Sequence, residues 1–228
     1  MSALPDLPPP PFIWLASQSP RRLDLLRQIG LRVAMLTPDE DEDAEALEAL
    51  RTGESPTQYV ERVTRAKAQA ARARWQRRGL PAAAILAADT TVAVGGTVLG
   101  KPTDDVDACR ILQELSGRGH RVLTAVAVVR GSQVQLRTQV SRVWFARLST
   151  AQIEAYVAGG EPQGKAGAYA IQGAAAAFVR KIEGSHAGIM GLPLHETALL
   201  LRPELRALQA PQAPPTSPQQ MSRPSPRP

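Results

Sequence analysis

The segment Leu15-Ala-Ser-Gln-Ser-Pro-Arg-Arg-Leu-Asp-Leu-Leu-Arg-Gln-Ile-Gly30 predicts the end of a strand, a tight turn and a helix. Ser19 suits the helix N-cap, and Pro20 suits the first helical position, where its missing N–H costs nothing. Apolar residues recur at helical spacing after the turn, and Gly30 suits the end of the helix. The segment therefore predicts that a strand passes directly into an amphipathic helix.

Two hydroxyls and two guanidinium groups gather at this turn, from Ser17, Ser19, Arg21 and Arg22. The start of a helix also presents unpaired N–H groups and the positive end of the helix dipole. Such a combination suits an anion, and phosphate above all. A capped helix with solvated arginines is the more ordinary interpretation, so this segment alone does not establish an anion site.

The composition indicates one sizeable core, or two lobes that share a cleft. The chain has 228 residues, of which 43% are hydrophobic. No apolar run approaches the length of a membrane helix, so we expect no membrane partner. Cys109 is the only cysteine, which excludes an intramolecular disulfide framework and favours a reducing, cytoplasmic location. We expect Cys109 to be a buried thiol rather than a nucleophile.

The chain is basic, with a formal net charge of +6, and much of the positive charge falls on one expected helix. Its members are Arg62, Arg65, Lys67, Arg72, Arg74, Arg77 and Arg78. This run raises the alternative of a nucleic-acid-binding protein that uses residues 58–78. A solvated helix face is the simpler interpretation, and no aromatic stacking pattern accompanies the run, so we do not expect nucleic acid as a partner.

Strand and helix signals are mixed along the chain with hairpin turns, which predicts an α/β fold with a mixed twisted sheet and flanking helices. The expected strands cover residues 12–16, 32–36, 84–88, 90–94, 97–99, 120–129, 133–148 and 177–182. The expected helices cover about residues 20–29, 56–79, 104–116, 151–157 and 193–201. We expect one folded domain over 12–208, between a flexible lead at 1–11 and a disordered Pro/Ser/Arg-rich tail at 209–228.

Asp89 follows an apolar strand, and polar groups at strand ends line the clefts of α/β folds. It suits a general base, a metal ligand or both, although an aspartate in this context more commonly caps a turn. Lys101 stands between Gly100 and Pro102, where it suits a point charge on phosphate. An exposed turn lysine is the alternative for that residue.

The segment Glu161-Pro-Gln-Gly-Lys-Ala-Gly-Ala-Tyr-Ala-Ile-Gln-Gly173 predicts a loop around a flat group. The Gln172 amide can both donate and accept, which matches the imide edge of uracil or thymine. It could equally bridge backbone groups of its own loop. The histidines (His120, His186 and His195) have no metal-ligand spacing, and we interpret them as structural.

Six short motifs together resemble the Maf family of nucleoside triphosphate pyrophosphatases over residues 12–201. They stand in the family's order and at comparable spacing: Ala16-Ser-Gln-Ser-Pro-Arg-Arg22, Ala88-Asp-Thr90, Leu99-Gly-Lys-Pro102, Leu115-Ser-Gly117, Lys165-Ala-Gly-Ala-Tyr-Ala-Ile-Gln-Gly173 and Gly191-Leu-Pro-Leu194. The fifth motif resembles the branch that acts on dTTP and UTP. The resemblance implies two lobes around a central cleft, as in inosine-triphosphate pyrophosphatases.

The resemblance also implies hydrolysis between the α and β phosphates of a nucleoside triphosphate. The products would be a nucleoside monophosphate and pyrophosphate. Asp89 matches the family's proton acceptor. The positions tied to substrate selectivity match Arg21, Thr90 and Gln172.

A divalent metal cation, Mg²⁺ or Mn²⁺, is implied as the cofactor. Glu42 matches an acidic position near the metal, and Asp89 is the other expected ligand; both offer the hard oxygens these ions prefer. Lys67 and Lys101 match basic residues that face the triphosphate. We expect Ser17, Ser19 and Arg22 to assist them through the helix start.

Further alternatives stay open. The family has been named for inhibition of septum formation, so a role as an interaction protein in cell division could exist beside catalysis. A related pyrophosphatase that removes non-standard purine triphosphates is another alternative, against which Gln172 argues by resemblance. Family resemblance also makes a homodimer plausible.

Overall fold

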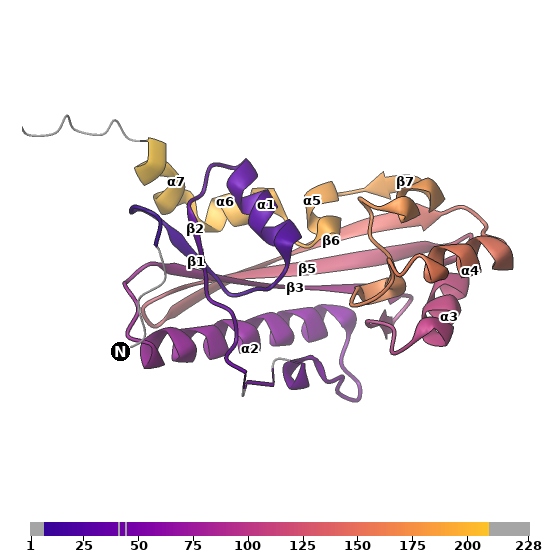
Figure 1. Ribbon diagram of the computed structural model, residues 1–228, viewed down its shortest axis with the longest axis horizontal. Helices are drawn as coiled ribbons and strands as arrows, with labels where there is room; N and C mark the ends of the chain where they lie inside the picture. Colours follow the sequence, from indigo (N-terminus) through magenta and orange to yellow (C-terminus); the bar gives the residue numbers. More distant parts are fainter. Residues whose placement is uncertain (1–6, 41, 44, 210–228) are drawn as a thin grey trace, which may run out of the picture.

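The computed structural model describes residues 7–40, 42–43 and 45–209, which form layers of helices on both faces of one mixed sheet (Figure 1). Residues 1–6 of the expected lead and residues 210–228 of the expected tail lie outside the described residues. Those two predictions are therefore untested there. Within the described part of the chain, no helix combines the length and the apolar character needed to cross a membrane.

The centre of the described chain is a seven-stranded sheet in the order β2-β1-β3-β5-β6-β7, with β4 paired to β3. Its strands are β1 (Ile13–Leu15), β2 (Val33–Met35), β3 (Ala84–Val94), β4 (Thr97–Leu99), β5 (Gly119–Arg130), β6 (Gln133–Phe145) and β7 (Val179–Glu183). β1 runs parallel to β2 and β3, and the remaining pairs are antiparallel. The predicted mixed sheet is confirmed.

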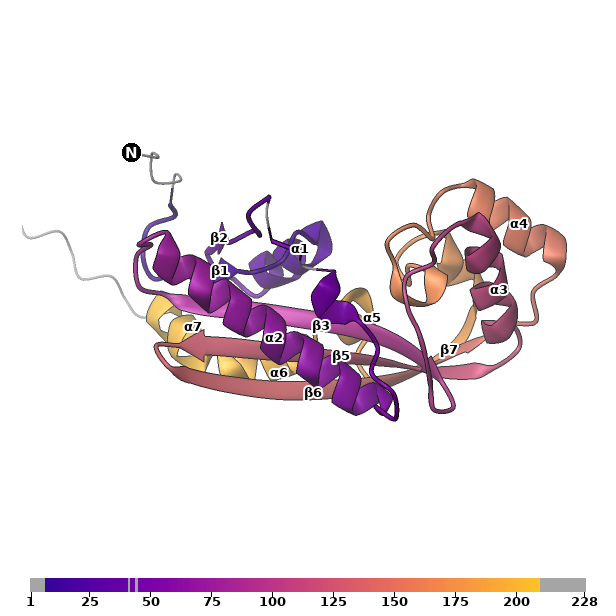
Figure 2. The same ribbon diagram turned by 90° about the horizontal axis from the view of Figure 1, so that it is seen from below.

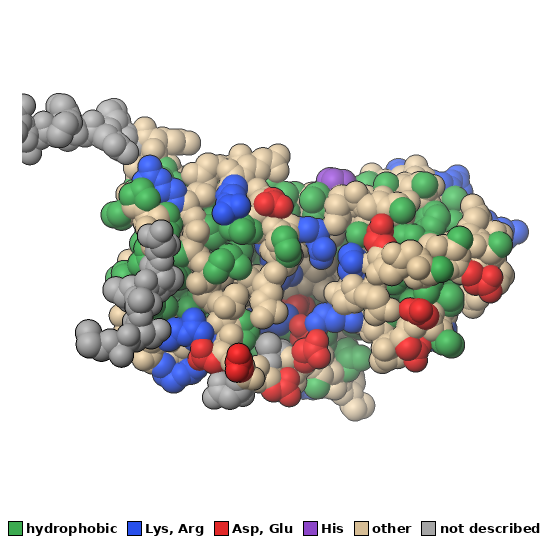
Figure 3. All heavy atoms as spheres, in the orientation of Figure 1, with side chains coloured by type: hydrophobic (Ala, Val, Ile, Leu, Met, Phe, Trp, Pro, Cys, Tyr) green, Lys and Arg blue, Asp and Glu red, His purple; other side chains and the backbone are tan. Residues whose placement is uncertain are grey.

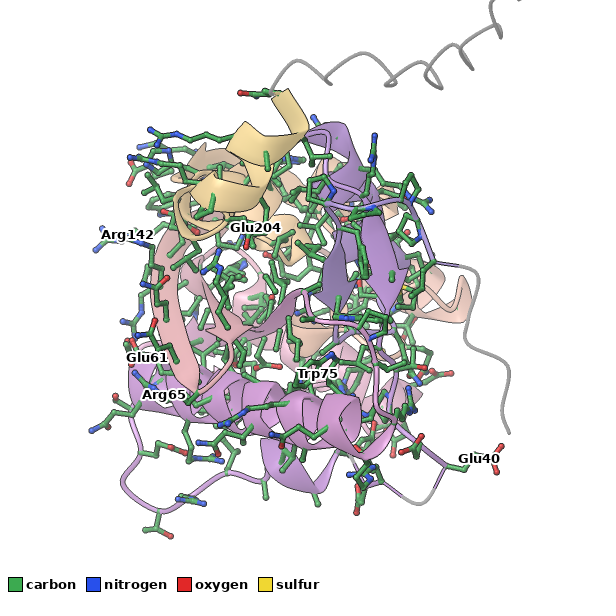
Figure 4. All side chains as sticks on the ribbon, turned by 90° about the vertical axis from the view of Figure 1, so that its left-hand side faces the viewer. Glu40, Glu61, Arg65, Trp75, Arg142 and Glu204 are labelled. Carbon is green, nitrogen blue, oxygen red and sulfur yellow. The ribbon has the colours of Figure 1, made fainter. Side chains whose placement is uncertain are left out.

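Helices cover both faces of this sheet. They are α1 (Pro20–Gln28), α2 (Pro56–Arg77), α3 (Asp105–Leu115), α4 (Thr150–Ala158), α5 (His186–Met190), α6 (Leu194–Leu200) and α7 (Arg202–Gln209), with short 3-10 turns η1 (Ala46–Glu48), η2 (Ala166–Ala168) and η3 (Ala174–Phe178). α2 lies on one face, and α1, α5 and α6 lie on the other (Figure 1). Figure 4, a view along the sheet, shows Trp75 of α2 on one side and Glu204 of α7 on the other. The sequence did not predict α7 as a helix separate from α6.

The long strands β5 and β6 continue from this region into a second, smaller lobe that contains α3 and α4 (Figure 2). The core of the smaller lobe includes Ile111, Leu115, Phe145, Ile153 and Tyr169. In the larger lobe, one apolar cluster lies between α1, α6 and the sheet, and others lie between α2 and the opposite face. The expected arrangement of two lobes is confirmed.

β3 is one continuous strand, although the sequence predicted a break at Asp89. β1 pairs with β3 only as far as Leu86, and β4 joins the same edge of β3 at Val92. The other edge of β3 stays paired with β5 throughout, with Asp89 opposite Ala125. Asp89 therefore lies in mid-strand, beside an opening in the sheet edge between β1 and β4.

The N-termini of α1 and α2 show how far the local sequence determines where a helix begins. At α2 the Ser55 hydroxyl accepts a hydrogen bond from the Gln58 N–H, and the Gln58 side chain accepts one from the Ser55 N–H. This capping box confirms the predicted start. At α1, Ser19 holds the N-cap position, but its side chain makes no capping hydrogen bond. The predicted N-cap residue of α1 is confirmed, although it does not cap the helix through its side chain.

Three further expectations need correction. The strand expected to reach residue 148 ends at Phe145, and the segment expected to be extended from residue 177 is a 3-10 turn until Phe178. Cys109 is half-buried rather than buried. Its pKa is raised by burial and by nearby carboxylates, which agrees with the expectation that it is not a nucleophile.

Candidate active site

A cleft of about 1020 Å³ lies between the two lobes. Lys, Arg, Asp and Glu side chains gather around this hollow (Figure 3). Most of the predicted site residues line it: Ser17, Ser19, Arg21, Arg22, Glu42, Lys67, Asp89, Thr90 and Lys101. The cleft is large enough for a nucleotide, and the structure brings residues from distant parts of the chain to one place.

The opening in the edge of β3 explains how the cleft reaches both faces of the sheet. Successive residues of a strand point to opposite faces. Asp89 accordingly meets Lys67 of α2, whereas Thr90 meets Arg22 of α1. Thr90 Oγ1 also lies 3.0 Å from Thr124 Oγ1 on β5.

Arg22 ties the turn between β1 and α1 to two other segments. Its Nε donates to the Gly191 carbonyl at 2.8 Å, and its Nη1 donates to the Ser17 hydroxyl at 3.1 Å. Its Nη2 lies 3.4 Å from Thr90 Oγ1. Burial lowers the pKa of Arg22, and the charge of Asp89 opposes this effect. The guanidinium thus positions the turn beside β3.

Arg21 lines the cleft from the larger lobe, and Lys165 lines it from the smaller lobe. Burial lowers the pKa of Lys165, and the charge of Arg21 lowers it further. Lys165 Nζ donates to the carbonyl oxygens of Glu161 at 2.5 Å and Gln163 at 3.3 Å. Two cations that repel each other across a cleft suit an anionic ligand. Lys165 belongs to one of the family motifs but was not among the predicted site residues.

Asp89 and Lys67 form a largely buried ion pair in the cleft. Lys67 Nζ lies 2.5 Å from Asp89 Oδ1 and 2.8 Å from Glu48 Oε1. Asp89 is only 6% exposed. Its carboxylate is therefore positioned by a single ammonium group that a second carboxylate also holds.

Glu48, which was not among the predicted site residues, connects Lys67 to Lys101. Glu48 Oε2 lies 2.9 Å from Lys101 Nζ. Burial alone would raise the pKa of Glu48, but the two lysines outweigh it and hold the pKa below its ordinary value. The pKa of Lys101 is raised because Glu48 outweighs the opposing effect of burial. Several acidic residues lie between Asp39 and Glu54, and the sequence does not indicate which of them reaches the two lysines.

Glu42 lines the cleft but has different partners. Arg74 donates to both of its carboxylate oxygens, with Nε at 3.0 Å from Oε1, and Arg77 lies 2.7 Å from Oε1. The hydrogen bond from Arg74 is the main cause that keeps the pKa of Glu42 low. The two expected metal ligands, Glu42 and Asp89, are thus each paired with their own cations.

Gln172 is the one predicted site residue that does not line the cleft. Its side chain is exposed, directly after the buried Ile171. The loop itself is well packed, since Gly167 approaches Val92 closely at a positive φ of 71°. The proposed contact of Gln172 with a nucleobase stays a prediction.

Much of the positive charge on α2 is neutralised within the protein, which weakens the nucleic-acid alternative. Arg62 pairs with Glu54, and Arg77 and Arg78 pair with Asp39. On the outer side of α2, Arg65 pairs loosely with Glu61 (3.4 Å; Figure 4). A basic run that is paired in this way offers few free cations to a phosphate backbone.

His120 is buried in the smaller lobe, where its Nε2 lies 2.9 Å from the Tyr169 hydroxyl. Burial lowers its pKa to about 4, so the ring is neutral near pH 7. This agrees with a structural role. Among the described residues, no group of three or more His, Cys, Asp or Glu side chains is arranged to hold a metal ion.

Comparisons with known proteins identify the family of this chain. The family model described as Maf-like protein matches residues 12–204. A dTTP/UTP pyrophosphatase of Ralstonia nicotianae is 59% identical over 86% of this chain and 96% of that protein, and one of Polaromonas sp. is 57% identical over 86% and 97%. Among solved structures, the Staphylococcus aureus Ham1 protein aligns with 14% identity and a TM-score of 0.39, over 59% of this chain and 71% of that chain. The match over most of the chain and the high identity to these relatives show that the chain belongs to the Maf family.

Proposed function

We propose that this chain is a nucleoside triphosphate pyrophosphatase that hydrolyses dTTP and UTP to the monophosphate and pyrophosphate. Relatives with 57–59% identity, matched over nearly their whole length, carry this activity in their names. The observation that carries the proposal is the gathering of Asp89, Lys67 and Lys101 in one cleft with the turn at residues 16–22. The cleft therefore combines a proton acceptor with cations for a polyphosphate.

The cations would bind and orient the triphosphate. A nucleoside triphosphate carries about four negative charges near neutral pH, so catalysis depends on positioning and on charge stabilisation. Lys67 and Lys101 reach the cleft from the larger lobe and from the loop after β4, and Arg21 and Lys165 reach it from α1 and the smaller lobe. Substrate bound among them would be held from both lobes.

Asp89 would act as the general base. Lys67 contacts its Oδ1 at 2.5 Å, so the second oxygen can receive a proton from a water molecule directed at the α-phosphorus. The low exposure of Asp89 limits competing contacts with solvent. The proton leaves the attacking water as the bond to the pyrophosphate group breaks.

Asp89 and Glu42 are the residues that would hold the divalent cation implied by the resemblance. Mg²⁺ commonly binds through one or two carboxylates together with substrate phosphates and water. Asp89 supplies one such carboxylate in the cleft, and Glu42 lines the same cleft as the second proposed ligand. When bound, the ion would offset negative charge on the leaving pyrophosphate.

Substrate selectivity would depend on residues near the mouth and walls of the cleft. Arg21 and Thr90 line it, and Gln172 belongs to the loop that follows η2 in the smaller lobe. We propose that Gln172 recognises the imide edge of uracil or thymine. A cytoplasmic location, proposed from the single cysteine, agrees with a nucleotide substrate.

The experiment that tests this function measures pyrophosphate release by the purified protein from dTTP, UTP, CTP, 7-methyl-GTP and ITP. Each nucleotide is assayed with Mg²⁺, with Mn²⁺ and with a chelator. Metal-dependent release from dTTP and UTP in preference to the others supports the proposal. Preference for ITP would favour the purine alternative, and absence of turnover on all five would contradict an enzymatic function.

A further inference from the structure

The Glu48 carboxylate bridges the two lysines that face the cleft. Its Oε1 lies 2.8 Å from Lys67 Nζ, and its Oε2 lies 2.9 Å from Lys101 Nζ. The lysines come from different elements, α2 and the loop between β4 and α3. One carboxylate thus engages two ammonium groups at once, in the way that a phosphate oxygen pair would.

The backbone that carries Glu48 is firmly held. The Tyr59 hydroxyl donates to the Glu48 carbonyl at 2.9 Å, and Arg62 donates to the carbonyls of Leu47 and Ala49 at 3.2 and 2.8 Å. Arg62 also pairs with Glu54 at 2.6 Å, which fixes the other end of the loop. Any departure of the carboxylate must therefore come from rotation of the Glu48 side chain.

A triphosphate and the Glu48 carboxylate cannot share these lysines without repulsion. Both are anions, and both need the same ammonium groups in a partly buried site where charges are weakly screened. With a polyphosphate in the cleft, Glu48 would keep its negative charge but lose its partners. Its side chain is about one-fifth exposed, so a route to solvent exists.

We propose that Glu48 is an internal occupant of the polyphosphate subsite formed by Lys67 and Lys101, and that its side chain is displaced when a nucleoside triphosphate binds. This inference rests on the proposed function, since it assumes that the cleft takes a polyphosphate. In the free protein the carboxylate keeps the two ammonium groups ordered and holds Lys67 beside Asp89. It sets the affinity of the cleft for polyphosphates by competing with them.

The chain offers a matched control in Glu45. Its Oε1 lies 3.6 Å from Lys101, but its side chain is 85% exposed and makes no bridge to Lys67. A variant at this position removes the same charge from the same loop. The Glu45 variant therefore measures the general effect of removing one negative charge from this loop. At an exposed site, solvent and salt screen that effect.

The test measures binding without turnover. Isothermal titration calorimetry with α,β-imido-dTTP, in the presence of a chelator, gives the dissociation constant for the wild type, Glu48→Gln and Glu45→Gln. We expect Glu48→Gln to bind about 5-fold more tightly than the wild type, the scale of one partly solvated charge pair. Glu45→Gln should change the affinity less than about 2-fold. Unchanged or weaker binding by Glu48→Gln would overturn the proposal.

A second readout separates competition from a purely structural role. Glu48→Gln leaves two ammonium groups without their bridge, so we expect its melting temperature to fall in the free protein. Saturating α,β-imido-dTTP should remove this deficit, because the ligand replaces the lost carboxylate. A deficit that persists in the complex would contradict the proposal. If the wild type turned over no nucleotide, the proposed function would fail, whereas wild-type turnover without tighter binding by Glu48→Gln would remove this inference alone.

Discussion

At the scale of single residues, the chemistry depends on Asp89, a carboxylate in the middle of a strand that is held by one lysine. The 2.5 Å contact with Lys67 Nζ fixes its position, and the opening of the sheet edge gives it access to the cleft. A carboxamide at this position would have nearly the same shape. It could not accept a proton from water at neutral pH, so substitution tests chemistry rather than packing.

We expect Asp89→Asn to lower kcat by at least ~100-fold, the usual scale for the loss of a general base. Steady-state pyrophosphate release from dTTP measures the effect. Asp24→Asn is the control, because Asp24 is exposed on α1 and does not line the cleft. It should leave kcat unchanged. Near-normal turnover by Asp89→Asn would contradict the assignment.

Gln172→Ala should weaken the preference for pyrimidine triphosphates more than it lowers turnover. The reason is that a lost base contact changes discrimination, whereas the phosphate cations and Asp89 stay in place. Competition between UTP and ITP in one reaction measures the ratio of the two kcat/KM values. An unchanged ratio would show that the exposed Gln172 has no part in base recognition.

Because His120 is buried, we expect the protein to lose stability in mild acid. Its pKa is about 4 in the folded protein because of burial, and 6.5 is the ordinary value. Between these pH values the unfolded chain therefore binds more protons than the folded protein. The contribution of neutral His120 to the free energy of unfolding is complete above pH 6.5, and it declines as the pH falls toward 4. At pH 5 the free energy of unfolding should be about 2 kcal/mol lower than at neutral pH because of this histidine.

Urea unfolding at pH 7 and pH 5 measures this loss, with His120→Gln as the comparison. The glutamine can still bond to the Tyr169 hydroxyl but does not titrate, so its unfolding free energy should depend less on pH. Equal pH dependence in the two proteins would mean that other groups cause the loss.

At the scale of elements, α2 joins the fold to the site, because it packs on the sheet and carries Lys67. Its start was predictable since Ser55, Pro56 and Gln58 are local signals. The continuity of β3 was not predictable, because pairing with β5 overrides a polar run that resembles a strand end. The bridging role of Glu48 was likewise not predictable, since it depends on hydrogen bonds from Arg62 and Tyr59 that hold η1 in place.

Ser55→Ala should lower the free energy of unfolding by about 1 kcal/mol, the usual contribution of an N-cap hydrogen bond. Ser19→Ala is the matched comparison, because Ser19 occupies the same position on α1 without a capping bond. Its loss should be less than about 0.5 kcal/mol. Urea unfolding of both variants at pH 7 measures the difference, and equal losses would contradict this account of the two helix starts.

At the scale of the whole molecule, both lobes contribute cations that surround the Asp89 carboxylate in the cleft. The larger lobe supplies Asp89, Lys67 and Arg21, and the smaller lobe supplies Lys165. The order of short motifs along the chain predicted this general arrangement, and membership of the Maf family agrees with it. Sequence could not predict which charges pair within the cleft, because Glu42 and Glu48 differ in their partners rather than in residue type.

The measurement that tests the central claim most directly is hydrolysis of dTTP in water enriched in oxygen-18, with mass spectrometry of the products. If water attacks the α-phosphorus, dTMP carries one heavy oxygen and pyrophosphate carries none. We predict that result, and we predict that Asp89→Asn nearly abolishes both products. Heavy oxygen in pyrophosphate, or formation of dTDP and inorganic phosphate, would contradict the proposed reaction.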